Sequence, residues 1–206
     1  MIEVHNAARG AAAAPPGESH DTLLAHLRKH TQPHPNASRP GGITFIRAAG
    51  EEAFLSYGDL YRRALGSLGQ LQKRGVRAGD EVVLQLEDNQ QFLVLFWACL
   101  LGRIVPVPLP VGNQEDHRHK LLNVWKLLAN PYLVSEASPY SRWEAFAVRK
   151  QRGTELAAIQ EKYLSAEGLA PVPGEEGTPA EVAPADLAYI QFSSGSTGHP
   201  KGVMLT

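Results

Sequence analysis

Residues 81–108 read EVVLQLEDNQQFLVLFWACLLGRIVPVP and decide the fold. Glu81 to Leu86 has the β-branched content of a buried strand. Asp88-Asn89 then begins a strongly apolar helix that runs through Leu101 and is closed by Gly102. Ile104 to Pro108 forms the next extended piece, and its prolines favour an edge strand or a strand end. The stretch therefore predicts a strand–helix–strand unit.

The residues that follow repeat this alternation. A third helix fits His117 to Leu128, and Pro131 to Val134 fits a third strand of the parallel type. Residues 141–163 are amphipathic and are expected to be helical, and Leu187 to Phe192 predicts a last strand. The order strand, helix, strand, helix, strand is typical of a doubly wound α/β fold, in which helices flank a mostly parallel sheet.

The chain before residue 81 predicts smaller elements. Residues 1–20 have no apolar face to bury and are expected to form a flexible leader. Asp21 or Thr22 can cap a short helix, and residues 43–46 and 53–55 predict a β-hairpin. Ser56, followed three residues later by an acidic residue, is a variant capping box. The helix that it opens carries one apolar stripe and stops at Gly75; the stripe consists of Leu60, Ala64, Leu65, Leu68 and Leu71.

Composition excludes several classes of function. Twenty Lys and Arg residues against 21 Asp and Glu residues leave a formal net charge of −1, without the cationic surplus of a general nucleic-acid binder. The one cysteine, Cys99, cannot form an internal disulfide, which suits a reducing compartment. The N-terminus shows no secretory signal, and the longest apolar run, residues 92–101, is about half of the roughly 20 residues that span a membrane. We therefore expect a cytoplasmic protein without a membrane span or a nucleic-acid partner.

The segment that carries chemistry follows the last predicted strand. Residues 193–202 read SSGSTGHPKG, with three glycines, four hydroxyls and one lysine. Glycine lets backbone N–H groups approach phosphate oxygens, hydroxyls donate hydrogen bonds, and lysine adds a positive charge. Each charge-assisted hydrogen bond contributes about 1.5–3 kcal/mol. The combination indicates a loop that can hold a polyanion such as a triphosphate.

The spacing does not fit the commoner phosphate loops. A Walker loop needs G-x-x-x-x-G-K-[ST], but Pro200 stands five residues after Gly195, and Gly202 follows Lys201 where a hydroxyl is needed. The dinucleotide fingerprint G-x-G-x-x-G fails because no two glycines here are separated by one residue. On composition alone, a turn or a linker is the simpler interpretation.

The ordered motif favours phosphate binding over a linker. Residues 194–202 match the pattern S-G-S-T-G-x-P-K-G completely, and residues 189–203 resemble the signature phosphate loop of the adenylate-forming superfamily. That superfamily includes acyl-CoA synthetases, fatty acyl-AMP ligases and nonribosomal peptide synthetase adenylation domains. Weaker similarities lie at residues 55–60, 75–84 and 98–107, so the resemblance covers about residues 21–206. It implies that residues 21–206 are an incomplete part of the large N-terminal domain of an adenylate-forming enzyme, with residues 168–186 as a surface loop.

The resemblance also implies a reaction and its site. A carboxylic acid attacks the α-phosphate of Mg²⁺-bound ATP, pyrophosphate leaves, and the acyl group then passes to a phosphopantetheine thiol of CoA or a carrier protein. Lysine, metal and N–H donors screen the approach of the two anions. The family's catalytic lysine belongs to a C-terminal domain, so neither a catalytic residue nor a metal ligand is expected in this chain. The resemblance gives the hydroxyl-donor role to Ser193, Ser194, Ser196 and Thr197, the backbone-turn role to Gly195, Gly198 and Gly202, and the electrostatic role to Lys201.

The subfamily stays open. Amino-acid-activating domains usually carry a Lys-Ala-Gly-like stretch and an acid after the next strand, whereas residues 100–110 contain no acid and three prolines. This looks more like fatty acyl-AMP ligases and the acyl-loading domains of polyketide and peptide assembly lines. An amino-acid adenylation domain and a non-catalytic binding module are the alternatives. Four other features are expected to be structural or solvated: His117-Arg118-His119 and Glu175-Glu176 as solvated segments, Cys99 as a buried apolar residue, and Trp97, Trp125 and Trp143 as core.

Overall fold

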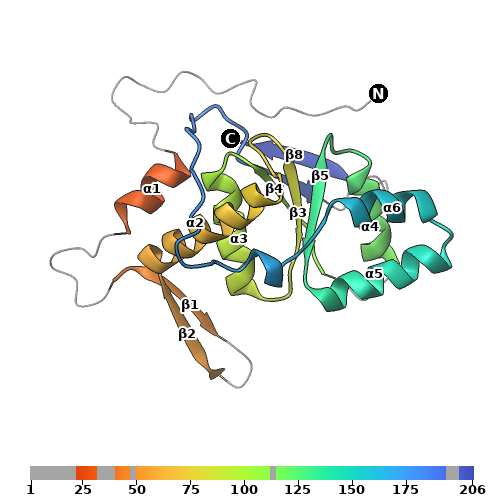
Figure 1. The fold of residues 1–206 in the computed structure, drawn as a ribbon, viewed down its shortest axis with the longest axis horizontal. Helices are drawn as coiled ribbons and strands as arrows, with labels where there is room; N and C mark the ends of the chain where they lie inside the picture. The colour runs from red at the N-terminus through yellow and green to blue at the C-terminus, as the bar shows by residue number, and fades with distance from the viewer. Residues whose placement is uncertain (1–21, 32–39, 47–49, 112–114, 194–199) are drawn as a thin grey trace.

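The computed structural model describes residues 22–31, 40–46, 50–111, 115–193 and 200–206. Its centre is a four-stranded sheet made of β3 (Glu81–Gln85), β4 (Val105–Pro108), β5 (Pro131–Ser135) and β6 (Tyr163–Ser165). The strand order is β4-β3-β5-β6, and all three neighbouring pairs are parallel (Figure 1). This confirms the doubly wound α/β fold, with β4 at the edge that its prolines predict.

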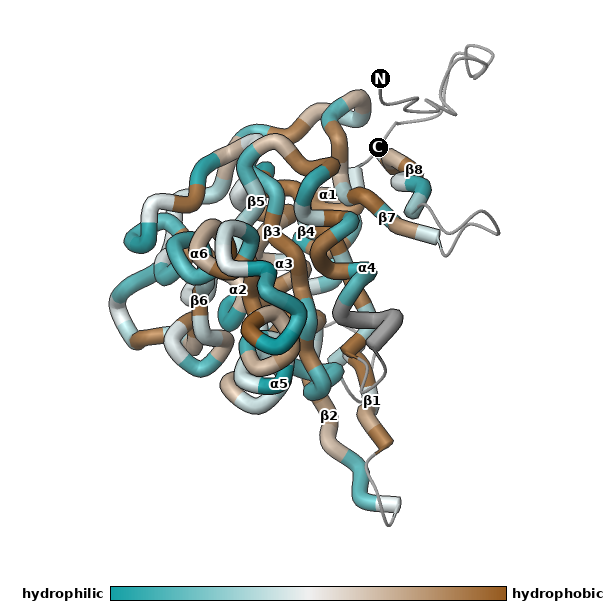
Figure 2. The backbone as a smooth tube through the Cα atoms, turned by 90° about the vertical axis from the view of Figure 1, so that its right-hand side faces the viewer, coloured by the Kyte–Doolittle hydropathy of each residue, from teal (hydrophilic) through white to brown (hydrophobic). Residues whose placement is uncertain are grey.

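Helices cover both faces of this sheet. On one face, α2 (Tyr57–Lys73) and α3 (Asn89–Leu101) bury their apolar stripes against alternate residues of β3 and β5, such as Val82 and Val134. On the other face, α4 (Glu115–Trp125), α5 (Ala137–Arg149) and α6 (Gly153–Glu161) pack with Val83 and Leu133. Figure 2 shows the hydrophobic strands of the sheet between these helix layers. Because the centre of β3 is buried on both faces, Val82, Val83 and Leu84 form a continuous apolar run.

Helix ends follow the predicted caps. Thr22 accepts a hydrogen bond from the backbone N–H of Ala25 and begins α1 (Leu23–Lys29). Ser56 Oγ accepts from the backbone N–H of Asp59 at 3.0 Å and donates to its carboxylate at 2.7 Å, as the variant capping box predicts. Asp88 caps α3 through the backbone N–H of Gln91 at 2.7 Å. The predicted hairpin is also present: β1 (Gly42–Ile46) and β2 (Glu52–Ser56) pair antiparallel and project from the body (Figure 1).

Residues 141–163 are mostly helical, as expected, but they form two helices and the start of a strand. The chain forms α5, breaks, forms α6 and then adds β6 to the sheet. The break lies at Gln151, whose φ of 54° is left-handed, while the backbone N–H of Arg152 returns to the carbonyl of Ala147 at 2.9 Å. This is a Schellman motif with glutamine where glycine is usual, so the sequence carries no glycine to mark it. Helix α4 also begins two residues earlier and ends three residues earlier than predicted.

Residues 170–188 contain no helix or strand and lie along α2 and α3. The backbone N–H of Gly177 donates to the carbonyl of Leu65 at 2.8 Å, and that of Ala180 donates to the carbonyl of Leu101 at 2.8 Å. Glu176 is exposed, as expected, and Glu175 is partly exposed; its carboxylate pairs with Lys73 Nζ at 2.5 Å and accepts from Gln70 Nε2 at 2.8 Å. The Lys73 ammonium, helped by that amide, lowers the pKa of Glu175 below its usual value.

The structure also places the other residues singled out above. Cys99 is fully buried, and burial raises the pKa of its thiol, so an apolar core role is confirmed. Trp143 is buried, and Trp97 and Trp125 pack against the core clusters. His119 is not simply solvated, since its ring packs edge-on against Phe146 with centroids 5.0 Å apart; the side chains of His117 and Arg118 lie outside the described residues. Across the described parts of the chain, no helix is long and apolar enough to cross a membrane.

Candidate functional site

The last two strands form a hairpin that carries the candidate phosphate loop. Strands β7 (Tyr189–Ser193) and β8 (Lys201–Leu205) pair antiparallel in a sheet of their own. Ser193 lies directly opposite Lys201 at the mouth of the hairpin, so residues 194–200 connect them. Five residues of the predicted site lie outside the described residues: Ser194, Gly195, Ser196, Thr197 and Gly198.

The two described polar residues of the loop lie where an anion could reach them. Both Ser193 and Lys201 are exposed. Side chains directly opposite each other in an antiparallel pair have Cβ atoms about 4.5–5.5 Å apart. From Cβ atoms this close, a serine hydroxyl and the ammonium of a flexible lysine side chain can reach the same oxyanion. The donor chemistry of the hairpin mouth therefore fits the phosphate groups of a nucleotide.

The opposite face of the hairpin is buried and fixes it to the body. Ile190 and Phe192 alternate with Gln191 and Ser193 along β7, and their side chains pack in the same cluster as Val105 and Val107 of β4. Tyr189 adds an edge-on contact to Phe96 of α3, with ring centroids 5.5 Å apart. The hairpin thus presents a polar outer face at its mouth while its inner face belongs to the core.

Gly202 has a different place from the one expected of it. The sequence predicted a glycine that permits the loop to turn, but Gly202 lies inside β8, opposite Phe192. A Cβ at Gly202 would lie 3.1 Å from the Phe192 ring and 3.1 Å from Ile190 Cγ2. A side chain at position 202 would therefore require the Phe192 ring and Ile190 to shift by a few tenths of an ångström.

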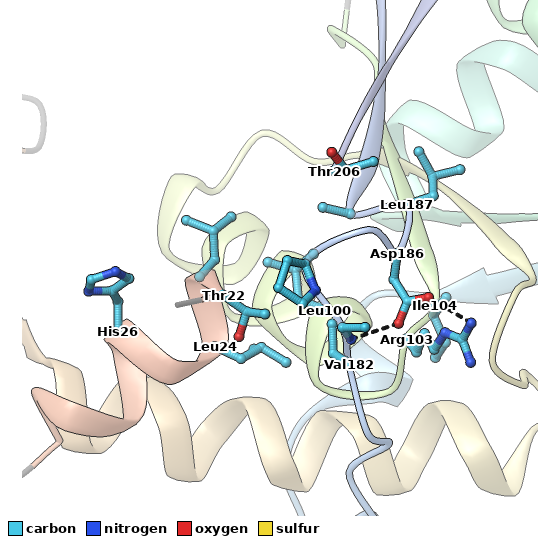
Figure 3. A pocket seen from close by; sticks show the side chains of 14 residues that line it. Thr22, Leu24, His26, Leu100, Arg103, Ile104, Val182, Asp186, Leu187 and Thr206 are labelled. Carbon is cyan, nitrogen blue, oxygen red and sulfur yellow. Dashed lines mark hydrogen bonds and ion pairs between the residues drawn. The ribbon is translucent and has the colours of Figure 1, made fainter. Parts of the chain in front are cut away.

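A cavity of about 420 Å³ lies at the other end of the hairpin (Figure 3). It is lined by α1, by the end of α3, by residues 182–188 and by Thr206. Because Tyr189 pairs with Leu205 at this end and Ser193 pairs with Lys201 at the other, the cavity is separate from the candidate phosphate loop. Arg103 and Asp186 meet at its wall, with Nη2 and Oδ1 2.8 Å apart. Sequence reasoning missed this pair, since 83 residues separate its members.

Folds of this type often bind ligands at the switch point of the sheet, where the connections from two neighbouring strands leave in opposite directions. In this protein, the carboxylate of Glu136 binds backbone N–H groups at that point. The switch point lies at the carboxyl ends of β3 and β5, whose connections leave in opposite directions. Glu136 Oε1 accepts from the backbone N–H groups of Glu87 at 2.8 Å and Asp88 at 3.1 Å, just before α3. Arg142 also pairs with Glu87 at 2.7 Å. A carboxylate of the protein therefore already binds these two N–H groups at the switch point. Within the described ranges, no three His, Cys, Asp or Glu side chains are grouped so as to hold a metal ion.

Comparison with known families identifies the chain. Residues 34–206 match the family model described as AMP-binding enzyme. The chain is 33% identical over 178 residues to the 4-hydroxybenzoate–CoA/benzoate–CoA ligase of Rhodopseudomonas palustris, an alignment that covers 81% of this chain and 30% of the ligase. It is 30% identical over 190 residues to cyclochlorotine synthetase of Talaromyces islandicus, which covers 92% of this chain and 3% of the synthetase. The chain belongs to the AMP-binding enzyme family.

Solved structures agree with this assignment. The structure of McyG A-PCP complexed with phenylalanyl-adenylate has a TM-score of 0.79 and 36% sequence identity, and the match covers 92% of this chain and 33% of that one. Fatty acyl-adenylate ligases from E. coli and L. pneumophila share the fold, with a TM-score of 0.70 at 23% identity over 90% of this chain and 31% of that one. The chain spans about 30% of the length of the CoA ligases it matches.

Proposed function

We propose that residues 21–206 form the N-terminal part of the adenylation domain of an ATP-dependent ligase. The ligase activates a carboxylic acid as its acyl adenylate and passes the acyl group to the phosphopantetheine thiol of CoA or a carrier protein, in the cytoplasm. One observation carries the proposal: a hairpin buried on its inner face places Ser193 and Lys201 together at the mouth of a loop with the family's phosphate-binding sequence. Acyl loading in polyketide or peptide biosynthesis is the role that the proline-rich residues 104–110 favour.

The residues of this chain hold and screen phosphate in the proposed reaction. Ser193 and the hydroxyls of Ser194, Ser196 and Thr197 donate hydrogen bonds to the β- and γ-phosphates of ATP, and Lys201 offsets their charge. Mg²⁺ supplies further neutralisation of the phosphate oxygens when it is bound. Gly195 and Gly198 keep the backbone close enough for N–H donors to contribute.

The acid that the enzyme uses is tested best by a panel drawn from the relatives. Aromatic acids occur in the names of the Rhodopseudomonas ligase and the McyG complex, and fatty acids in the names of others. An adenylation domain for an amino acid remains the second candidate because of the 36% identity to the McyG structure. Exchange of radiolabelled pyrophosphate into ATP, measured on the full-length protein with benzoate, 4-hydroxybenzoate, phenylalanine, a keto acid and a series of fatty acids, separates these candidates by the acid that supports exchange.

Two substitutions in the full-length protein test the use of the loop. Lys201→Ala removes the cation and is expected to raise the KM for ATP, whereas Val203→Ala, on the same exposed face of β8, is expected to leave it unchanged. Gly195→Val adds a β-branched side chain that blocks backbone approach to the phosphates, and it is expected to raise the ATP requirement with the fold intact. Equal KM values in all four proteins, wild type included, would show that the loop does not bind phosphate.

Calorimetric titration of the 206-residue chain with Mg²⁺ and ATP tests the non-catalytic alternative. Weak or undetectable binding is expected, since in the family the adenine and ribose contacts come later in the sequence. Tight binding by this chain alone would favour a nucleotide-binding module over the N-terminal part of a ligase.

A further inference from the structure

The turn between α3 and β4 places an arginine, Arg103, in a backbone conformation that favours glycine. The backbone N–H of Ile104 returns to the carbonyl of Cys99 at 2.9 Å, and that of Arg103 to Leu100 at 3.2 Å. These bonds define a Schellman motif whose left-handed residue is Arg103, with a φ of 53°. Glycine is the usual residue there because a Cβ disfavours the left-handed conformation.

The glycine next to Arg103 does not occupy the left-handed position of the turn. Gly102 lies one position earlier, where a Cβ would be 2.5 Å from Leu68 Cδ1 and 3.0 Å from Ile104 Cδ1. Packing against α2 thus favours glycine at position 102, but no packing requires arginine at position 103, which lies at the surface. A backbone conformation held at a cost points to a use for the side chain.

The Arg103 side chain reaches the segment that leads into the phosphate-loop hairpin. Its guanidinium pairs with Asp186 at 2.8 Å, three residues before β7 begins (Figure 3). The other carboxylate oxygen of Asp186 accepts the backbone N–H of Ala183 at 2.8 Å, and the backbone N–H of Asp186 donates to the Ala183 carbonyl at 3.0 Å. Asp186 therefore fixes the turn in which it lies, and Arg103 fixes that turn to the end of α3.

This connection matters because the described hairpin is held to the parallel sheet by the packing of Ile190 and Phe192 and not by a ladder of backbone hydrogen bonds. Strands β7 and β8 pair only with each other, although β7 lies beside β4. Arg103 lies two residues before β4 begins at Val105, and Asp186 lies three residues before β7 begins at Tyr189. The pair thus ties the start of β4 to the start of β7, on the side of the hairpin opposite the phosphate loop.

We propose that Arg103 is a positioning residue whose ion pair with Asp186 fixes the β7–β8 hairpin, and with it the phosphate loop, against the parallel sheet. The link to ATP rests on the proposed function, but the link to hairpin position does not. Position is measured as the distance between spin labels at Arg63→Cys on α2 and Val203→Cys on β8, both exposed residues. Cys99 is buried with a raised thiol pKa, so it does not compete for the label.

Three variants of the 206-residue chain distinguish an effect on the position of the hairpin from an effect on the stability of the fold. Arg103→Gly removes both the ion pair and the left-handed strain, so it is expected to widen the distance distribution without lowering the melting temperature. Asp186→Asn keeps an acceptor for Ala183 and is expected to widen the distribution equally. Gln151→Gly relieves the same strain in the comparable motif after α5 and is expected to leave the distribution as in wild type.

In the full-length enzyme, Arg103→Gly and Asp186→Asn are each expected to raise the KM for ATP about two- to fivefold, the range that a partly exposed ion pair provides. The double variant is expected to be no worse than either single one, and Arg103→Lys is expected to restore part of the loss. Unchanged distance distributions in the single variants, or widened distributions with an unchanged KM, would overturn the proposal. Absence of ATP exchange in the wild-type enzyme would instead contradict the proposed function, and the distance measurement would still decide the position of the hairpin.

Discussion

Replacing Gly69 with alanine should destabilise the protein, although the same change stabilises most helices. Alanine in a helix interior is favoured over glycine by about 1 kcal/mol. In α2, however, a Cβ at Gly69 would lie 2.2 Å from the backbone oxygen of Glu175 and 3.0 Å from the backbone nitrogen of Gly177. Ordinary contact begins at 3.4 Å, so the segment must retreat by 3.4 − 2.2 = 1.2 Å.

That retreat breaks the contacts that hold residues 175–178 on the helix. The hydrogen bond from Gly177 N–H to the Leu65 carbonyl, now 2.8 Å, contributes about 1 kcal/mol net. Overpacking adds about 1–3 kcal/mol. After the helix propensity of alanine is subtracted, Gly69→Ala is expected to lower the free energy of unfolding by about 1–3 kcal/mol, or the melting temperature by about 2–12 °C.

Thermal and urea unfolding followed by circular dichroism measure this effect. The matched control is Gly153→Ala in α6, where no atom lies within 4 Å of the Cβ position, and which is expected to be neutral or slightly stabilising. A Gly69→Ala protein as stable as wild type would show that residues 171–177 do not pack against α2 in the way described.

Two further predictions concern titration. Lys73 lowers the pKa of Glu175 in the folded state, so the unfolded state binds more protons there, and stability should fall as the pH drops below about 4.5. Urea unfolding at a series of pH values should show that the free energy of unfolding depends less steeply on pH in Glu175→Gln than in wild type. The same pH dependence in both proteins would refute the pairing. Burial, with a contribution from Glu167, raises the pKa of Tyr163 to about 12, so stability should fall between pH 10 and pH 12 as the unfolded phenol ionises first. The absorbance at 295 nm, wild type minus Tyr163→Phe, should show a midpoint near 12, and a midpoint near 10 would contradict this.

Much of the parallel sheet can be predicted because its signals are local. Strand β3 has an apolar, β-branched centre, α3 has an aspartate cap, and Pro106 and Pro108 place β4 at an edge. Strand β6 escapes prediction because its three residues are too few to show a period. The break before α6 escapes because Gln151, not a glycine, takes the left-handed conformation.

The candidate site likewise combines a motif that the sequence shows with contacts that only the structure shows. The loop motif is contiguous, so the sequence shows it, and the structure adds that Ser193 and Lys201 lie opposite each other. Two contacts elsewhere in the structure join residues that are distant in the sequence: Glu136 with Glu87, and Arg103 with Asp186. No local pattern marks either pair, because each partner is a charged residue of an ordinary kind, and only the topology of the sheet brings them together.

Pyrophosphate exchange in the full-length protein, compared between wild type and Lys201→Ala, tests the central claim most directly. The proposed function predicts ATP-dependent exchange that requires one class of carboxylic acid, with a raised KM for ATP in the variant. Exchange that is absent with every acid of the panel, or that shows the same KM for ATP in both proteins, would contradict the assignment of the β7–β8 hairpin as the phosphate-binding element of an adenylate-forming ligase.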